Sequence, residues 1–402
     1  MVRTLPDEIM GKLKEFRGKV DVVVGIPSYN NAETISYVAQ VASEGIVKYF
    51  GGKGLVLNSD GGSNDGTKET FMNTDTGGIP KLAFDYVGIP GKGSALRALM
   101  EAAALVESRA LVFLDSDLRS VKPWWVERLS MPIMEGKAVY VTPLYKRHKY
   151  DGTITNHICY PLTSVLYGKK VRQPIGGDFG VGDTMVEIYL SKPDDVWKSD
   201  VARFGIDIWM TTVALCEDGR IVQAALGAKI HDVKDPGKHL GPMFSQVVGT
   251  LFSLMQIYER KWMDLEVTPG DVEVYGEVVK VDVEEISVDL DNLRCKAMEG
   301  VRENETTLLD LTENSIVRDV LRRGTLGSEE WVRIVYDLST SFRKKELEDT
   351  VIKALIPLYF ARVAGFVEET LSMSTEEAER VIEDQLLLFH SMKSYLKERW
   401  AD

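Results

Sequence analysis

The residues Ala110-Leu111-Val112-Phe113-Leu114-Asp115-Ser116-Asp117 place two carboxylates directly after a short apolar run. Five consecutive apolar residues are typical of a strand that is buried on both faces of a parallel sheet. Open α/β sheets bind their ligands at the carboxyl ends of such strands. Residues two apart in an extended segment point to the same side, so Asp115 and Asp117 can serve one cation or its hydration shell. A D-x-D triplet arises easily by chance in a chain with 61 acidic residues, so the flanking elements decide its meaning.

Strand and helix patterns alternate on both sides of this stretch. Short, mostly apolar segments predict strands at residues 20–26, 54–58, 82–87, 110–114, 138–142 and 221–226. Helical patterns run over 32–49, from 67 onward, and over 94–108. Four strands that alternate with helices before Asp115 predict an α/β fold with an open, mostly parallel sheet.

The 402-residue chain is longer than a single core usually supports, so a second domain or a large appendage is expected. The composition shifts after Thr268-Pro269-Gly270, and repeated helical patterns fill residues 304–400. We therefore predict a first domain over 1–268 and a mainly helical C-terminal region over 269–402. The apolar segment 241–262 has helical spacing and is expected to pack on the sheet.

Charge and composition exclude several classes of protein. A net charge of −13 opposes binding to nucleic acid. The basic cluster Lys146-Arg147-His148-Lys149 is either a solvated loop or a pocket for a small anion. No run of about 18 apolar residues occurs, and the charged start of the chain does not resemble a signal peptide, so we predict a cytoplasmic protein that does not bind membranes. The three cysteines are expected to be reduced packing residues.

Two other predicted strands also end in polar turns. The strand up to Pro27 runs into Ser28-Tyr29-Asn30-Asn31, and the next ends at Asp60 before a glycine-rich turn. Such positions can face a base or ribose, although an ordinary capped turn has the same composition. Gly91-Lys92-Gly93-Ser94 places a cation at the positive end of a helix, which suits a diphosphate as well as a surface turn. The segment lacks the spacing of a P-loop.

Taken in order, these pieces resemble the GT-A glycosyltransferases. The segments that carry the resemblance are Pro27-Ser28-Tyr29-Asn30, Asp60-Gly61-Gly62-Ser63, Gly91-Lys92-Gly93 and Asp115-Ser116-Asp117. Three later blocks, 173–178, 204–209 and 229–232, are similar to a narrower group of retaining enzymes with a helical C-terminal extension. That group comprises mannosylglycerate synthase and glucosyl-3-phosphoglycerate synthase. The motifs cover roughly residues 20 to 260.

The resemblance implies a role for each matching residue. Asp117 and His231 would bind Mg²⁺ or Mn²⁺, with Asp115 supporting the ribose or the metal's water shell. Asp207, Asp178 and Gly177 would lie at the donor sugar and form the catalytic set. The residues expected to bind the sugar nucleotide are Pro27, Tyr29, Asn30, Glu33, Asp60, Gly91, Lys92, Asp115, Ser116 and Gly176.

The implied activity is retaining transfer of glucose or mannose from a GDP- or UDP-linked donor to a small hydroxy acid. D-Glycerate and 3-phosphoglycerate are the expected acceptors, which would make the product a compatible solute, glucosylglycerate or mannosylglycerate. The polar candidates for holding the acceptor are Thr163, Arg172, Lys234 and His239. The resemblance also implies a homodimer.

Three alternatives stay open at this point. An inverting GT-A transferase could act on a polyprenyl phosphate or a glycan, which predicts a membrane anchor or amphipathic tail. A binding-only protein would sense a nucleotide sugar without turnover. Within the retaining hypothesis, double displacement through Asp207 or Asp178 competes with a mechanism that needs no enzyme nucleophile.

Overall fold

The computed structural model describes residues 3–230, 236–278 and 283–401, with the side chains of 236–240 left out. Its described residues form two compact units, each built from several segments of the chain. Of these residues, unit 1 contains 3–146, 173–230 and 272–278, and unit 2 contains 147–172, 236–271 and 283–401. The segments 147–172 and 236–268, which were predicted to belong to the first domain, therefore belong to the mainly helical unit. A single boundary at residue 268 does not describe this division.

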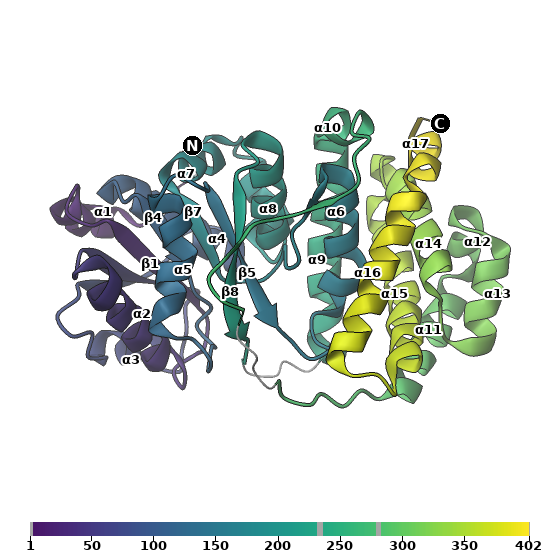
Figure 1. Ribbon diagram of the computed structural model, residues 1–402, viewed down its shortest axis with the longest axis horizontal. Coiled ribbons are helices and arrows are strands. Elements are labelled where there is room, and N and C mark those ends of the chain that lie inside the picture. The colour runs from purple at the N-terminus through teal and green to yellow at the C-terminus, as the bar shows by residue number, and fades with distance from the viewer. Residues whose placement is uncertain (1–2, 231–235, 279–282, 402) are drawn as a thin grey trace. The chain divides into compact units, whose positions relative to one another are not determined.

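Unit 1 is an eight-stranded, mostly parallel sheet with the order β10-β8-β5-β7-β4-β1-β2-β3 (Figure 1). Among the described strands of this sheet, β7 alone runs antiparallel, between β4 and β5. The strands are β1 (Val22–Ser28), β2 (Gly54–Asp60), β3 (Lys81–Asp85), β4 (Ala110–Phe113), β5 (Tyr140–Lys146), β7 (Phe179–Gly182), β8 (Ile221–Ala228) and β10 (Val274–Tyr275). Every residue of β1, β2 and β4 is buried, which explains their uninterrupted apolar runs. The predicted α/β class and the six predicted strands are confirmed.

Helices cover both faces of this sheet. Helices α2 and α5 pack against each other and on the strands of one face, whereas α4 packs with α7 and α8 (Figure 1). The helices of unit 1 are α1 (Asp7–Leu13), α2 (Ile35–Phe50), α3 (Thr67–Asn73), α4 (Lys92–Val106), α5 (Pro123–Met134), α7 (Asp183–Ser191) and α8 (Ile206–Glu217). Short 3₁₀ turns lie at Lys14–Phe16, Val196–Lys198 and Asp200–Ala202. This layering leaves the carboxyl edge of the parallel strands for the loops that carry the polar motifs.

Unit 2 is built around the long, apolar helix α15 (Glu348–Thr370), most of whose residues are buried. The other helices are a π-turn at Thr155–Cys159 followed by α6 (Tyr160–Tyr167), then α9 (Pro236–Ile257), α10 (Glu259–Met263), α11 (Leu290–Glu303), α12 (Glu305–Leu311), α13 (Asn314–Arg323), α14 (Ser328–Ser341), a 3₁₀ turn at Lys345–Leu347, α16 (Thr375–Ser391) and α17 (Lys393–Ala401). Strands β6 (Lys169–Lys170) and β9 (Gly270–Asp271) form a small parallel pair. The predicted helical C-terminal region is confirmed.

Helices α9, α11 and α14 all contact α15. The expectation that residues 241–262 pack on the sheet is therefore corrected: α9 belongs to unit 2, where α15 offers it an apolar surface. The segment Lys345–Thr370 is long and apolar enough to cross a membrane, yet most of it is buried among the other helices of unit 2, as in the core helix of a soluble protein. A helix that is apolar on all sides needs such a covering on every side.

The chain at Leu326 docks directly on the backbone of α15. Its N–H donates to the carbonyl of Ala361 at 2.9 Å, and its carbonyl accepts from Nη1 of Arg362 at 3.1 Å. A Cβ at Gly365 would lie 2.1 Å from the Leu326 carbonyl oxygen. Gly365 is therefore required for this backbone-to-backbone approach.

We expect Gly365→Ala to destabilise the protein by about 2 kcal/mol or more, because neither backbone segment can move aside without losing its hydrogen bonds. Gly249→Ala is the matched control: no described atom lies within 4 Å of its added Cβ, and alanine favours the α9 helix by up to about 1 kcal/mol. Urea unfolding, monitored by tryptophan fluorescence, measures the stability of both variants. Equal midpoints for the two variants would contradict the packing at Leu326.

Candidate active site

The predicted polar motifs of unit 1 converge on the carboxyl edge of its sheet. Asp60 ends β2, Asp115 follows β4, and Lys229 follows β8. Lys92 opens α4, and Asp207 lies in the first turn of α8. Parallel strands deliver these groups to one edge, as the open α/β class predicts.

At one end of this edge, the loop after β1 interlocks with the turn after β2. Asp60 is fully buried, and its carboxylate accepts from the hydroxyl groups of Ser28 (2.6 Å) and Ser63 (2.7 Å) and from the N–H groups of Gly62 (2.9 Å) and Ser63 (2.6 Å). Four bonds within the chain make Asp60 the anchor of its own turn. Direct bonding of this carboxylate to a nucleoside remains a prediction.

In the loop after β1, Tyr29 is 64% exposed. Asn30 adopts a left-handed conformation, φ 54°, and its side-chain oxygen accepts from the Asn64 N–H at 3.1 Å. Glu33 is exposed and Pro27 is buried in β1. The exposed tyrosine is the member of this group best placed to stack on a base, and the contacts predicted for the others stay predictions.

The D-x-D turn is fixed to the first loop through Ser116. Its hydroxyl donates to the side-chain oxygen of Asn31 at 2.8 Å, and its carbonyl accepts from the Thr34 hydroxyl at 2.7 Å. The same oxygen of Asn31 also accepts from the N–H of Tyr29 at 3.0 Å. Asn31 thus ties the predicted base platform to the predicted metal turn.

The centre of the edge holds three carboxylates against two ammonium groups. Nζ of Lys92 lies 3.0 Å from Oδ1 of Asp115 and 3.3 Å from Oδ2 of Asp207. Nζ of Lys229 lies 2.8 Å from Oδ2 of Asp115 and 2.9 Å from Oδ2 of Asp178. We call these five residues the charge cluster. Lys92 and Lys229 thus share Asp115 between them.

Burial and pairing set the protonation of the charge cluster. Burial acts to raise the pKa of Asp115, but the ammonium groups of Lys229 and Lys92 hold it far below its usual range. Burial likewise acts to lower the pKa of Lys92, and the carboxylates of Asp115 and Asp207 raise it above its usual value. The pKa values of Asp178 and Asp207 are raised, chiefly by burial. Burial disfavours the ionised form of both side chains, and the negative charge of Asp115 adds to this effect.

This charge balance fits a divalent cation. Three carboxylates face two ammonium groups, Asp117 adds another carboxylate nearby in the chain, and Oδ1 of Asp207 is buried without a hydrogen-bond partner in the described part of the protein. Carboxylate oxygens are ligands for both Mg²⁺ and Mn²⁺. Asp115 already has both oxygens paired with lysines, which suits an indirect role better than direct ligation. No group of three or more His, Cys, Asp or Glu side chains that could hold a metal occurs within 3–230, 236–278 and 283–401. His231, the predicted second ligand, lies outside those ranges.

The glycines beside Lys92 serve packing. A Cβ at Gly93 would lie 1.8 Å from the Val201 carbonyl oxygen, and one at Gly91 would lie 2.5 Å from that of Ala202. The N–H of Gly93 donates to the Arg203 carbonyl at 3.1 Å, and that of Gly91 donates to the Tyr86 hydroxyl at 2.8 Å. The predicted diphosphate seat therefore depends on the Lys92 side chain rather than on these two amides.

Sequence comparison supplies the context for this geometry. No protein-family model matches the chain. The chain is 26% identical over 270 residues to the glucosyl-3-phosphoglycerate synthase of Mycobacterium tuberculosis, an alignment that covers 62% of this chain and 78% of that protein. The enzymes of that name from Mycolicibacterium smegmatis and Mycolicibacterium paratuberculosis match at 26% and 25% identity and are covered over 82% and 76% of their length. The chain is a glycosyltransferase of the GT-A type.

Solved structures of the M. tuberculosis enzyme are also similar to this glycosyltransferase. A complex with Mn²⁺, UDP-glucose and phosphoglyceric acid is 27% identical with a TM-score of 0.49, and a complex with Mg²⁺ and UDP is 26% identical with a TM-score of 0.48. Both alignments cover 62% of this chain and 85% of the other.

Two of the residues proposed for the acceptor are used inside unit 2 of the glycosyltransferase. The Thr163 hydroxyl is buried and donates to the Cys159 carbonyl at 2.6 Å, while Arg172 pairs with Glu379 through Nε at 2.5 Å and Nη2 at 2.9 Å. Lys234 and the side chain of His239 lie outside the described residues. Their binding of an acceptor remains a prediction.

The basic cluster at residues 146–149 is not an open anion pocket at Lys149. Its ammonium donates to the carbonyl groups of Thr370 and Met373, at 2.8 and 2.5 Å, and so caps the end of α15. A cation at a helix C-terminus is a structural stabiliser. Lys149 is therefore not part of a solvated loop either, because its ammonium is bound to backbone carbonyl groups.

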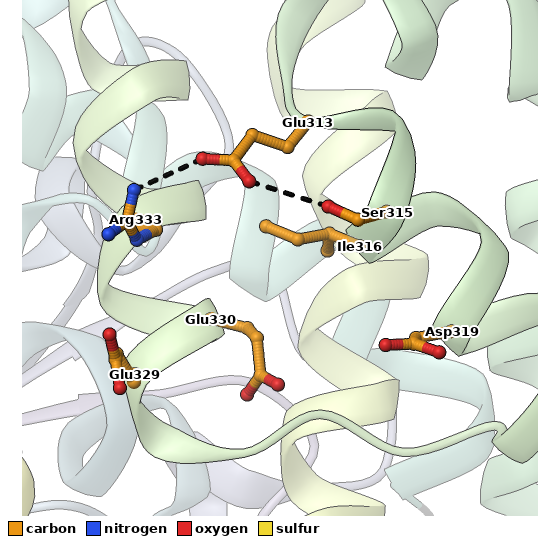
Figure 2. A pocket seen from close by; sticks show the side chains of 7 residues that line it. All are labelled: Glu313, Ser315, Ile316, Asp319, Glu329, Glu330 and Arg333. Carbon is orange, nitrogen blue, oxygen red and sulfur yellow. Dashed lines mark hydrogen bonds and ion pairs between the residues drawn. The ribbon is translucent and has the colours of Figure 1, made fainter.

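A polar cavity of about 410 Å³ lies within unit 2, between α13 and α14 (Figure 2). Its lining residues are Glu313, Ser315, Ile316, Asp319, Glu329, Glu330 and Arg333. Glu313 accepts from Nη1 of Arg333 at 3.1 Å and from the Ser315 hydroxyl at 3.4 Å. None of the residues predicted for catalysis lines this cavity.

Sequence reasoning assigned no role to Lys229 and Tyr145, both of which contact Asp178. The Tyr145 hydroxyl donates to Asp178, and Lys229 lies over the Tyr145 ring, 5.3 Å from its centre. Their signal was position: each lies at the carboxyl end of a strand in the sheet domain. A lysine just before the predicted metal histidine could have been noticed for that reason.

Gly177 leaves the space in which the charge cluster meets. Its φ is +89°, and an added Cβ would lie 2.2 Å from Oδ2 of Asp115 and 2.9 Å from Nζ of Lys229. We expect Gly177→Ala to lower turnover about 10²-fold, because a shift of about 1 Å in an aligned group has that effect. Gly249→Ala, on an α9 surface in unit 2, should keep wild-type turnover. Near-normal kcat in the Gly177 variant would contradict the assigned packing.

Proposed function

We propose that this glycosyltransferase is a retaining glucosyltransferase that transfers glucose from UDP-glucose to 3-phosphoglycerate with Mg²⁺ or Mn²⁺ as cofactor. The observation that carries the proposal is the position of Lys92, at the start of α4 and between Asp115 and Asp207 on the carboxyl edge of the sheet. The names of the matching enzymes favour glucose over mannose and phosphoglycerate over glycerate. UDP rather than GDP is the base found in the related complexes.

The donor diphosphate would take Lys92 as its cationic partner. Its ammonium is held by two carboxylates at the head of a helix, where the macrodipole also favours an anion. A diphosphate entering there would compete with Asp207 for this ammonium at 3.3 Å, the longer of its two carboxylate contacts. Asp207 would then be released toward the hydroxyl groups of the sugar.

Asp117 and His231 would hold the cation, with Asp115 kept ionised beside it by two lysines. When bound, the metal would supply neutralisation of the charge on the departing UDP. Asp115 would support the ribose or the metal's water shell. Tyr29 would stack on the base, and Asp60 would keep the adjoining turn in place.

Retention would follow from attack on the face from which UDP leaves, with a diphosphate oxygen taking the acceptor proton. Asp178 is a poor nucleophile in this reading, since it is fully buried and accepts hydrogen bonds from Tyr145, Lys229 and the N–H of Asp115. Asp207 is held by Lys92. Neither carboxylate is needed as a covalent carrier. A cytoplasmic homodimer is also part of the proposal; the homodimer is what the family resemblance implies.

We expect the purified protein to release UDP and form glucosyl-3-phosphoglycerate from UDP-glucose and 3-phosphoglycerate in the presence of Mn²⁺. EDTA should abolish the reaction, and so should Asp117→Ala, with an unchanged circular-dichroism spectrum. GDP-mannose, D-glycerate and a polyprenyl phosphate serve as competing substrates in the same assay. Faster turnover with a competing pair would replace the proposed substrates, and turnover resistant to EDTA would contradict the metal assignment.

Proton NMR of the anomeric centre tests retention: an α-linked product is expected, and a β-linked one would establish the inverting alternative.

Lys92→Met should lower kcat by about 10²- to 10³-fold, the effect of removing one preorganised partner of the developing charge. The matched control is Lys68→Met, which removes another lysine of unit 1 that pairs with a carboxylate, Asp85, at 2.5 Å. Steady-state kinetics and thermal melting of both variants separate loss of catalysis from loss of fold. A Lys92 variant with the kcat of the Lys68 variant would remove Lys92 from the diphosphate site.

A further inference from the structure

The Lys229 side chain lies at the meeting point of two loops in the charge cluster. It follows β8 and is 5% exposed. Its ammonium donates to Oδ2 of Asp115 at 2.8 Å, to Oδ2 of Asp178 at 2.9 Å and to the Gly176 carbonyl at 2.9 Å. An ammonium has three donors, and these three acceptors come from the turn after β4 and the loop before β7. One side chain therefore joins the D-x-D turn to the loop 176–178.

Asp178 completes this junction from the other side. Its Oδ1 accepts from the backbone N–H of Asp115 at 2.8 Å, and its Oδ2 accepts from the Tyr145 hydroxyl as well as from Lys229. Lys229, Tyr145, Asp178 and Asp115 belong to the ends of β8, β5, β7 and β4. These are four consecutive strands of the sheet. The antiparallel direction of β7 brings its first residues to the edge where the parallel strands end.

The electrostatics explain why a cation is required at this place. Asp115 and Asp178 both lie within hydrogen-bonding distance of the same ammonium, so without it two largely buried carboxylates would face each other. Repulsion would then push the loop 176–178 away from Asp115. Lys92 cannot replace Lys229, because its ammonium contacts the other oxygen of Asp115.

We propose that Lys229 is a positioning residue that holds Asp115 and the loop 176–178 in one arrangement, with Asp178 as its buried anchor. Lys229 acts through these carboxylates and through the backbone of Gly176, and Asp178 serves structure rather than covalent catalysis. This inference rests on the proposed function, because Asp115 and the loop 176–178 are the parts that would meet the metal–nucleotide and the donor sugar.

The test is a double-mutant cycle on Lys229→Met and Asp178→Asn. Two quantities are measured for each variant: kcat with UDP-glucose and 3-phosphoglycerate, and the dissociation constant of Mn²⁺–UDP by calorimetry. Lys229→Met should lower kcat about 10²-fold and weaken Mn²⁺–UDP binding about tenfold, because the freed carboxylates displace the turn. Adding Asp178→Asn removes the repulsion while keeping the shape, so the double variant should regain at least tenfold in kcat over Lys229→Met. Lys192→Met, which removes a lysine paired with Glu217 at the surface, is the control and should match the wild type.

If Lys229 and Asp178 acted independently, Asp178→Asn would not restore kcat in the Lys229→Met background. If Lys229 contacted the substrate directly, Asp178→Asn would lower activity further in the Lys229→Met background, and this result would overturn the proposal. So would a Lys229→Met variant within about threefold of wild-type kcat. If Lys229→Met does not fold, Lys229→Gln, which keeps N–H donors and loses the charge, takes its place in the cycle with the same criteria. If the wild-type protein binds Mn²⁺–UDP but turns over no substrate pair, the proposed function is wrong. The role of Lys229 is still tested in that case, because the double-mutant cycle can be evaluated from the dissociation constants of Mn²⁺–UDP.

Discussion

The sharing of Asp115 between Lys92 and Lys229 is the interaction on which the rest of the site depends. Buried charges are tolerated in proteins only when they are paired in good geometry, and breaking one such pair costs about 3–5 kcal/mol. Asp115 satisfies this condition with one lysine on each carboxylate oxygen. This pairing therefore requires that the end of β4, the end of β8 and the start of α4 lie close together at the carboxyl edge of the sheet.

The surroundings of the charge cluster follow from this requirement. Gly177 has to lack a side chain because two members of the cluster meet where its Cβ would be. Gly93 has to lack one because the 3₁₀ turn Asp200–Ala202 packs on the start of α4, just before Asp207. The glycines of these motifs thus act by allowing charged side chains to come together, and their backbone amides contribute less to the site. The site keeps a surplus of carboxylates, which is the condition under which a cation is attracted.

The strands and their polar ends could be predicted because a buried parallel strand has a local signature, an apolar run followed by a polar turn. Asp115 and Asp60 were found in this way, Lys92 was found from its place at the start of a predicted helix, and the structure brings Asp115 and Lys92 into contact. The antiparallel β7 escaped prediction because its four residues include Gly180 and Gly182 and have no clear pattern. The roles of Lys229 and Tyr145 depend on contacts with a residue far along the chain, which no local pattern encodes. The allocation of α6 and α9 to unit 2 is likewise decided by the apolar surfaces that α15 and α16 offer them. The metal ligation by Asp117 and His231 stays a prediction.

The most direct measurement is a crystal structure of the protein with Mn²⁺ and UDP, with the metal located by its anomalous scattering. We expect Mn²⁺ bonded to Asp117, the Lys92 ammonium turned to the diphosphate, and Lys229 still joining Asp115 to Asp178. Manganese bound away from Asp117, or a diphosphate that leaves Lys92 on Asp207, would contradict this expectation.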